Sequence, residues 1–400
     1  MSSKNVLVIA SCYPMPDRAS GDFRFTQLLR MLAVENSVYF LPMATEWQLN
    51  NEGSEAVEHY RSLLSDINVT PLGDGLMEAL RVRPYRFVFI EFWYVARDCI
   101  DLVRYLQPRV VVVVDSVDVA FNRLEAKARL TQADEDIKTA AEVRKNELQV
   151  YEKADLVIVV TKEDALILSD TSKYIHTFII PNIHPTHAPR NAEHVLEKQM
   201  VFIGSFSHEP NVDAMLFFCR EVLGLVLEQE PNARLWIIGN KPPTEIQELA
   251  NEQVEILGYV PDTKPYLEKA AVSIAPLRFG GGMKGKIGEA MSYGLPVVTT
   301  QVGVEGFGLE IGTDVLVANT PQDFAKAVVR LIRDRKYASM VGKSGFDFIN
   351  STYSYDAIER RCEKLVELIG KAEPRKLPPM LRLRMFFKAI YERNIAWRFT

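Results

Sequence analysis

Short apolar runs of strand length alternate with longer amphipathic segments along this chain, and the whole alternation occurs twice. In the first half the runs are VLVIAS, SVYFLP, RFVFIEFW, RVVVVVDS, DLVIVVT and TFIIPN; in the second half they are MVFIGS, ARLWIIG, VEILGYV, VSIAPL, LPVVTT and DVLVAN. A strand buried on both faces reads as a continuous apolar run, and parallel strands need long crossovers. The sequence therefore predicts an α/β protein with two facing Rossmann-like domains.

An irregular segment, PNIHPTHAPRNAEH, separates the two halves and is rich in proline, asparagine and histidine. We interpret it as a hinge. The predicted division is an N-terminal domain at 1–185, a linker at 186–198, a C-terminal domain at 199–350, and final helices with a tail at 351–400. Because ligands of open α/β sheets bind beyond the carboxyl ends of the strands, we expect the site in the cleft between the domains.

Length and composition exclude several classes of protein. Four hundred residues with 48% hydrophobic and 25% charged residues are typical of two globular domains. The formal net charge of −5 argues against a nucleic-acid binder. Four widely spaced cysteines form neither a zinc motif nor a disulfide framework, and no apolar run approaches the ~20 residues of a membrane span. We expect a soluble, cytoplasmic protein.

The stretch RFGGGMKGKIGEAMSYGLPVVTT, from Arg278 to Thr300, follows a predicted strand. Its glycines Gly280, Gly281 and Gly282 let the backbone approach a ligand, and the helix that begins near Lys284 directs unpaired N–H groups there. An anion is the natural occupant. The stretch is not a P-loop, because Ile287 stands where the hydroxyl that binds magnesium is needed.

Lys286 and Glu289 lie three residues apart on that helix and therefore share a face. The lysine suits a phosphate and the glutamate suits ribose hydroxyls, so together they indicate a nucleoside diphosphate. The alternative is a solvated helix pair beside a mobile glycine loop.

The segment VSIAPLRFGGGMKGKIGEAMSYGLPVVTTQVGVEGF resembles the donor-nucleotide motif of GT-B glycosyltransferases, specifically the large retaining family four. Further segments are similar to that family in the same order: PMPDRASGDFRFTQLLRML, ADLVIVVTKEDA, IIPNIH, VFIGSFSHEPNVDAMLFF, LWIIGNKPP and ILGYVPD. The combined order is more specific than any single motif and covers most of the chain. The resemblance implies a GT-B fold and transfer of a sugar from a nucleotide-diphosphate donor.

The resemblance also implies roles for individual residues. In the family, the second of two glutamates separated by seven residues contacts the donor ribose, and that position is Glu289. The first falls on Gly281, so a carboxylate near the donor sugar is lost. The family's usual arginine and lysine after the first strand of the C-terminal domain are also absent. The expected substitutes at the pyrophosphate are Arg278, Lys284 and Lys286, with His208 as a further donor contact.

In the N-terminal domain the resemblance implies three further contacts. Many relatives have a histidine after the strand that corresponds to VVVVVD, and Val117 stands there in this chain. Asp118 is then the candidate for a sugar hydroxyl or acceptor contact, with a helix N-cap as the alternative. Gly21 and Arg24 match the loop near donor phosphate and acceptor; the alternative for Arg24 is a solvated helix residue.

Metal chemistry is not expected. The triplet Asp134, Glu135 and Asp136 lies in a charged helical stretch, where carboxylates are simply solvated. No two histidines have ligand spacing on a helix, and His184 and His187 belong to the linker.

The resemblance therefore implies a metal-independent hexosyltransferase that needs no cofactor and transfers a sugar to an acceptor hydroxyl with retention. A glycan or lipid-linked acceptor in surface polysaccharide synthesis is the associated expectation. The alternatives are an epimerase of the same fold and a protein that binds nucleotide sugars with little catalysis.

The last thirty residues, 371–400, carry eight basic residues against two acidic ones in an otherwise acidic protein. Basic and apolar residues are interleaved, which is typical of an amphipathic helix at an anionic bilayer. The alternative is a helix that returns to the N-terminal domain and packs there through Leu381, Met385, Phe386, Ile390 and Trp397.

Overall fold

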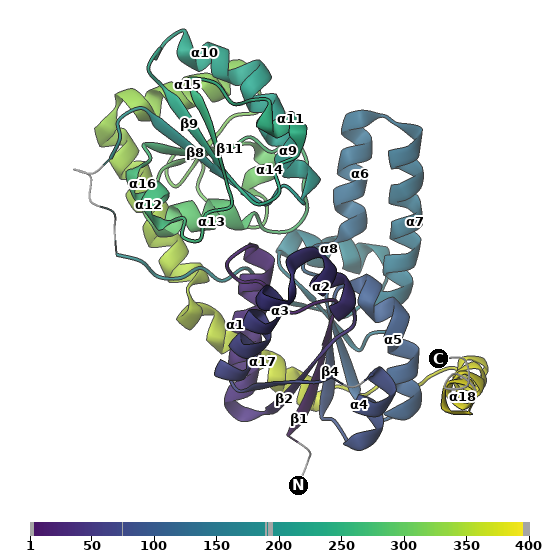
Figure 1. Ribbon diagram of the computed structural model, residues 1–400. Coiled ribbons are helices and arrows are strands. Elements are labelled where there is room, and N and C mark those ends of the chain that lie inside the picture. Colours follow the sequence, from purple (N-terminus) through teal and green to yellow (C-terminus); the bar gives the residue numbers. More distant parts are fainter. Residues whose placement is uncertain (1–3, 74, 189, 191–194, 395–400) are drawn as a thin grey trace.

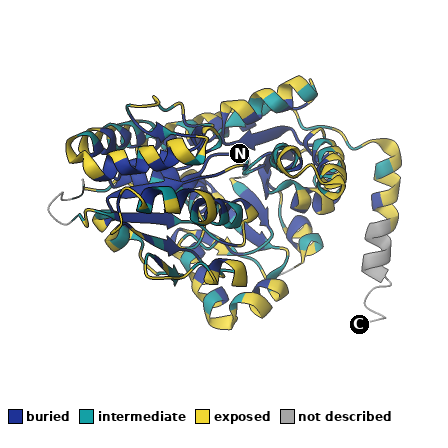
Figure 2. Cartoon of the chain, turned by 90° about the horizontal axis from the view of Figure 1, so that it is seen from above, coloured by how far each residue is buried: buried dark blue, intermediate teal, exposed yellow. Residues whose placement is uncertain are grey.

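The computed structural model describes residues 4–73, 75–188, 190 and 195–394, with side chains as far as residue 387. Two α/β domains, each built on a parallel sheet, confirm the predicted fold class (Figure 1). The burial pattern explains the alternation in the sequence, since the central strands of each sheet are buried while the helices expose one face (Figure 2).

The N-terminal domain has a seven-stranded parallel sheet in the order β3-β2-β1-β4-β5-β6-β7. The order in which successive strands are added to the sheet reverses between β1 and β4, and this topological switch point leaves a crevice at the carboxyl ends of the two strands. The strands are β1 (Asn5–Ala10), β2 (Ser37–Pro42), β3 (Val69–Pro71), β4 (Phe87–Glu91), β5 (Val111–Asp115), β6 (Leu156–Val159) and β7 (Thr177–Ile179).

Helices cover both faces of this sheet. Alternate residues of β4 point to opposite sides: Phe87 and Phe89 pack with one set of helices, and Val88 and Ile90 with the other. The helices are α1 (Ser20–Glu35), α2 (Thr45–Glu52), α3 (Ser54–Asp66), α4 (Leu76–Val82), α5 (Trp93–Leu106), α6 (Ala120–Thr131), α7 (Asp134–Tyr151) and α8 (Lys162–Thr171).

The C-terminal domain has a six-stranded parallel sheet in the order β10-β9-β8-β11-β12-β13, with its reversal between β8 and β11. The strands are β8 (Gln199–Ile203), β9 (Arg234–Ile238), β10 (Val254–Gly258), β11 (Val272–Ala275), β12 (Val297–Thr299) and β13 (Leu316–Val317). The helices are α9 (Glu209–Phe217), the π-helix η2 (Phe218–Val222), α10 (Leu223–Leu227), α11 (Thr244–Gln247), α12 (Lys264–Lys269), α13 (Gly285–Ser292), α14 (Gln301–Val304), α15 (Pro321–Arg333) and α16 (Arg335–Tyr353).

The chain crosses between the domains a second time near residue 354. Helix α16 packs against α13, so the division predicted at residue 350 falls inside a helix of the C-terminal domain. Helix α17 (Tyr355–Lys371) then packs against α1 through an apolar stripe that includes Ile358 and Leu365. This return gives the two domains a second covalent connection (Figure 1).

The last helix, α18 (Pro379–Asn394), lies against α5 at the edge of the N-terminal domain. The alternative that the tail packs on the N-terminal domain is correct for the Met385 side chain, which is 7% exposed. It is not correct for the Phe386 side chain, which is 45% exposed. The side chains of Ile390 and Trp397 lie outside the described residues. Within the described part of the chain, none of the helices has the length and apolar character needed to traverse a bilayer.

Candidate active site between two topological switch points

The loop Gly280–Lys284, which follows β11, packs directly on the loop that follows β5 in the other domain. A Cβ atom built on Gly281 would lie 2.8 Å from Oδ2 of Asp118. Gly282 has a φ of +56°, and its Cβ would lie 3.2 Å from the carbonyl oxygen of Val117. The glycines therefore serve a close approach of two backbones, and they bring the crevices of the two sheets to one cleft.

Val117 has a φ of +59°, in the left-handed region that a β-branched residue rarely adopts. Its side chain lies beside Gly21 on α1. A Cβ atom built on Gly21 would lie 3.6 Å from Cγ1 of Val117. Strained residues of this kind persist only where the surroundings over-determine them, and they are common at ligand sites. The loop after β5 is therefore held in place by α1 and by the glycine loop together.

Lys284 stands immediately before α13 and is 6% exposed. Its Nζ donates a hydrogen bond to the carbonyl oxygen of Gly282 at 2.9 Å and lies 3.4 Å from Oε2 of Glu305. Burial lowers the pKa of this ammonium group below its ordinary value. Lys284 thus has two roles: its hydrogen bond fixes the shape of the glycine loop, and its ammonium group brings a positive charge to the cleft.

Lys286 lies one position inside the first turn of α13, with its Nζ 5.7 Å from the ring centre of Phe202. Burial, followed by repulsion from Lys284, lowers its pKa to about 8. Among the described side chains, no carboxylate lies within salt-bridge distance of this Nζ. Its charge therefore has no direct salt bridge there, and the Glu289 carboxylate favours it only from a greater distance. A lysine that binds phosphate needs such an unpaired ammonium group.

Glu289 shares the face of α13 with Lys286, as predicted from their spacing. Its Oε1 accepts a hydrogen bond of 2.7 Å from the Thr263 hydroxyl. Burial raises the pKa of this carboxyl group. The carboxylate is thereby oriented with acceptor capacity to spare, which suits a pair of ribose hydroxyls.

His208 precedes α9 on the opposite side of the β8/β11 crevice. Crowding by the surrounding cleft atoms desolvates the imidazole and, followed by the cations Arg123 and Lys286, lowers its pKa to about 4, although the surface of His208 remains exposed to solvent. A neutral imidazole at neutral pH can donate one hydrogen bond and accept another. His208 and Lys286 therefore lie close together, one in the loop after β8 and the other in the first turn of α13.

The structure places Arg278 elsewhere. Its guanidinium donates to both carboxylate oxygens of Asp213 on α9, at 2.9 Å for the Nε bond, and lies 5.1 Å from the ring centre of Phe217. These contacts hold the exposed side chain against α9. The charge of Arg278 is thus already paired with a carboxylate, unlike that of Lys286.

Asp118 does not cap a helix. Helix α6 begins at Ala120 without a side-chain cap, and the N–H groups of Ala120 and Phe121 donate instead to the Glu147 carboxylate, at 3.0 and 2.8 Å. The Asp118 carboxylate accepts a hydrogen bond of 2.7 Å from Nε of Arg123. The N-cap alternative is therefore wrong, and the partly exposed carboxylate faces the glycine loop.

Arg24 is completely buried, so it is not the solvated residue that the alternative described. Its guanidinium forms an ion pair with Asp115 at 2.7 Å and donates to the carbonyl oxygen of Ile180 at 2.9 Å. These bonds tie α1 to the carboxyl end of β5 and to the residue that directly follows β7. Arg24 has no free face toward an acceptor and acts as an internal brace.

Sequence reasoning missed the crevice between β1 and β4. Glu91 ends β4, is 5% exposed, and has a buried oxygen, Oε1, with no hydrogen-bond partner among the described residues. Burial raises its pKa, and burial also raises the pKa of nearby Asp22 to about 6. The next residue, Phe92, has a φ of +68°. A carboxylate ending the apolar run FVFIE was the available signal, because it lies at the carboxyl end of a central strand.

Polar contacts bridge the domains at two separate places. Nζ of Lys127 on α6 lies 2.8 Å from the Glu209 carboxylate on α9. Nζ of Lys241, after β9, lies 2.6 Å from the Glu52 carboxylate at the end of α2. The cleft is therefore spanned by contacts that a hinge motion would break.

The acidic triplet lies in the first turn of α7. Asp136 pairs with Lys127 at 2.9 Å and accepts a hydrogen bond from Thr131 at 2.6 Å. Within the described ranges, no group of three histidine, cysteine, aspartate or glutamate residues is arranged to hold a metal ion. Metal independence remains a prediction.

Comparisons with known proteins agree with this architecture. Residues 197–334 match the family model described as Glycosyl transferases group 1. A Klebsiella pneumoniae protein, described as an uncharacterized 44.6 kDa protein in the cps region, is 24% identical over 183 residues. That alignment covers 44% of this chain and 47% of the relative, so it spans about half of each.

Two solved structures cover nearly the whole fold. Sucrose-phosphate synthase from Thermosynechococcus elongatus superposes with a TM-score of 0.65 and 16% identity, over 91% of this chain and 99% of that one. HepE from Anabaena, solved in complex with UDP-glucose, gives a TM-score of 0.67 and 11% identity over the same shares. This chain thus has the two-domain GT-B fold, and residues 197–334 of its second domain are similar to the glycosyl transferases group 1 family.

Proposed function

We propose that this protein is a retaining glycosyltransferase that moves a hexose from a nucleoside-diphosphate sugar to an acceptor hydroxyl. The single observation that carries the proposal is that Lys286, at the start of α13, has no salt-bridge partner among the described side chains and lies on the same helix face as the oriented carboxylate of Glu289. A nucleoside diphosphate would supply negative charge beside Lys286, and its ribose hydroxyls would donate hydrogen bonds to the carboxylate. The complex of the structurally similar HepE with UDP-glucose supports this class of donor.

Each residue of the cleft then has a distinct task. Lys286 and the N–H groups of α13 stabilise the charge that develops on the departing diphosphate, without a metal or another cofactor. Lys284 holds the glycine loop in the shape that exposes those groups, and His208 contacts the donor from the opposite loop. Asp118 provides a carboxylate beside Gly281, from the other domain, for a sugar hydroxyl.

We place the acceptor at the crevice between β1 and β4. Glu91 and Asp22 have raised pKa values there, so a protonated carboxyl group can donate a hydrogen bond to an acceptor oxygen. Replacement Glu91→Gln keeps a donor and should preserve acceptor affinity, whereas Glu91→Ala should weaken it. An unchanged KM for the acceptor in both variants would remove Glu91 from the acceptor site.

The similar Klebsiella protein is described as lying in the cps region. This supports a glycan or lipid-linked acceptor in surface polysaccharide synthesis. The four cysteines form no disulfide, which fits a reducing cytoplasm. Exclusion of water from the bridged cleft would protect the transfer from hydrolysis.

Incubation with UDP- and GDP-sugars and a polysaccharide-repeat acceptor tests the reaction. Release of nucleoside diphosphate that depends on the acceptor, with a product of unchanged anomeric configuration, is the expected result. Isomerised donor without transfer would indicate an epimerase. Binding without either product would indicate a nucleotide-sugar binding protein, and an inverted product would contradict retention.

A further inference from the structure

Helix α18 presents several large apolar side chains to solvent. Met380 is 85% exposed, Phe387 61%, Leu383 57% and Phe386 45%. Met385, on the other side of the helix, joins the core beneath α5. The helix stands out from the body of the molecule with much of its surface uncovered (Figures 1 and 2). Contiguous apolar exposure of this kind marks an interaction surface.

The exposed residues are ordered around the helix. At about 100° per residue, Phe386, Leu383, Phe387 and Met380 fall on one continuous arc of about 120°. Two exposed cations, Arg382 and Arg384, lie at the two edges of this arc. An apolar face flanked by cations is the pattern of a helix that lies in a bilayer interface.

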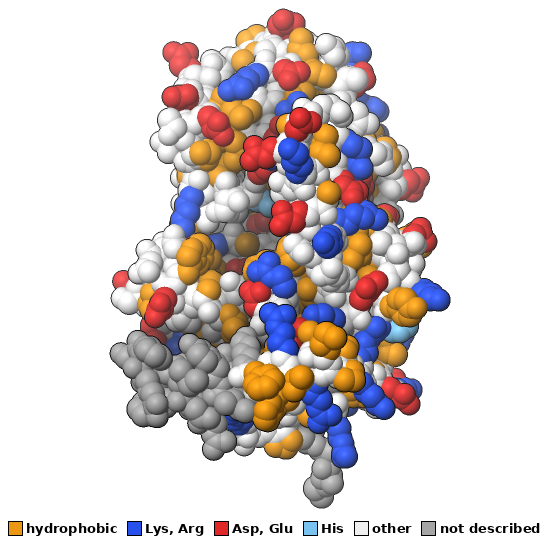
Figure 3. Space-filling view, turned by 90° about the vertical axis from the view of Figure 1, so that its right-hand side faces the viewer, with side chains coloured by type: hydrophobic (Ala, Val, Ile, Leu, Met, Phe, Trp, Pro, Cys, Tyr) orange, Lys and Arg blue, Asp and Glu red, His pale blue; other side chains and the backbone are white. Residues whose placement is uncertain are grey.

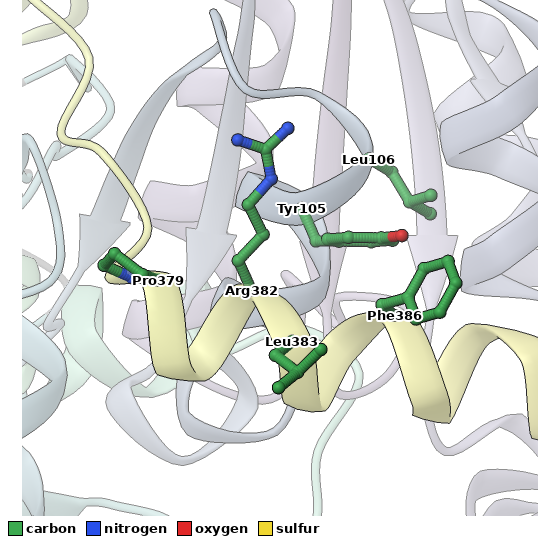
Figure 4. A pocket seen from close by; sticks show the side chains of 6 residues that line it. All are labelled: Tyr105, Leu106, Pro379, Arg382, Leu383 and Phe386. Carbon is green, nitrogen blue, oxygen red and sulfur yellow. The ribbon is translucent and has the colours of Figure 1, made fainter.

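A groove of about 600 Å³ continues the apolar arc toward the end of α5. Figure 4 shows Arg382 and Phe386 rising from α18 on either side of the Tyr105 ring. Leu106 and Leu383 complete the apolar lining. A groove with apolar walls and one guanidinium suits an acyl chain whose phosphate lies beside the arginine.

Charge also favours an anionic occupant. Between residues 374 and 387 the chain has four basic residues and no aspartate or glutamate, although the whole protein is acidic. Arg375 is engaged with the backbone of the N-terminal domain, through the carbonyl oxygens of Glu152 and Tyr174. Within the described side chains, neither Arg382 nor Arg384 pairs with a carboxylate. Hydrophobic and basic side chains gather in the lower part of this side of the molecule (Figure 3).

We propose that α18 and the α5–α18 groove dock this protein on an anionic phospholipid bilayer. The apolar arc enters the boundary between headgroups and acyl chains, and the flanking arginines contact lipid phosphates. Such a surface binds without a membrane-spanning helix. This proposal does not depend on the proposed transfer reaction, since the residues of the docking surface lie on α5 and α18, away from the cleft loops.

Co-sedimentation of the full-length protein with vesicles tests the proposal. The protein should pellet with vesicles of phosphatidylcholine and phosphatidylglycerol, remain largely in the supernatant with phosphatidylcholine alone, and be released as NaCl rises. The double variant Arg382→Gln/Arg384→Gln should lower the partition coefficient by about 25-fold, at about fivefold per arginine. Leu383→Ser/Phe387→Ser should lower it at least about tenfold, since both side chains lose apolar burial.

A matched variant controls for net charge. Arg129→Gln/Lys138→Gln removes two exposed cations from the α6–α7 hairpin and should leave vesicle binding unchanged. Far-UV circular dichroism and UDP affinity, measured on every variant, separate loss of docking from unfolding and from failure of the donor site. If the wild-type protein stays in the supernatant with anionic vesicles, the proposal is wrong. It is equally wrong if both α18 variants bind as wild type does, or if the hairpin variant loses binding as strongly.

Discussion

The pKa of Lys286 leads to a quantitative prediction for nucleotide binding. The free protein holds this ammonium group at a pKa of about 8, because burial and Lys284 disfavour its charge. A bound diphosphate should return the pKa toward the ordinary value of about 10.4. Binding therefore favours protonated Lys286, so the affinity is full below pH 8 and falls as the pH rises above it.

The magnitude follows from these two values. Between pH 7 and pH 9 the dissociation constant of UDP should increase about tenfold, since the free lysine changes from about 90% to about 10% protonated. At pH 8.5, binding should take up about 0.7 of a proton. Isothermal titration calorimetry in two buffers with different ionisation enthalpies measures both quantities.

Two variants distinguish the effect of Lys286 on the pH dependence of UDP binding from the effect of titration of the nucleotide itself. Lys286→Met should weaken binding at pH 7 and remove the dependence between pH 7 and pH 9, and Lys286→Arg should keep the affinity but also flatten the curve. The reasoning fails if Lys286→Met retains the tenfold change or takes up the same fraction of a proton.

Three further predictions concern the cleft. Glu289→Ala should weaken UDP binding by about 1.5–3 kcal/mol while leaving inorganic pyrophosphate binding unchanged, which competition calorimetry can measure; equal losses for both ligands would refute the ribose assignment. Gly282→Ala should lower kcat more than Gly258→Ala, because both have positive φ but an added Cβ meets the opposite domain only at Gly282; similar kcat values would show that the interdomain approach is unimportant. Transfer should survive EDTA, because Lys286 and backbone N–H groups meet the diphosphate charge; an enzyme that is inactivated by EDTA and restored by magnesium or manganese would contradict this.

The fold could be predicted because its signals are local. Buried parallel strands appear as continuous apolar runs, and Pro181 begins the irregular segment that separates the domains. The same holds for Lys286 and Glu289, since a spacing of three on a short helix fixes a shared face regardless of tertiary structure.

The ion-pair partners of individual arginines could not be predicted in this way. Arg278 is neutralised by Asp213, and Arg24 is buried against Asp115, so each partner comes from a distant part of the chain. A pattern in one segment shows that a cation is present, but not which carboxylate lies nearest after folding. Glu91 was missed for the related reason that burial, rather than spacing, gives it a distinct chemistry.

The central claim is that the β8/β11 crevice binds a nucleoside diphosphate through the start of α13. A crystal structure of the protein with UDP tests it most directly. We predict the diphosphate beside Nζ of Lys286 and the first N–H groups of α13, with the ribose hydroxyls at the carboxylate of Glu289. UDP bound elsewhere, or bound in the crevice with its ribose away from Glu289 and its phosphates away from Lys286, would contradict the account.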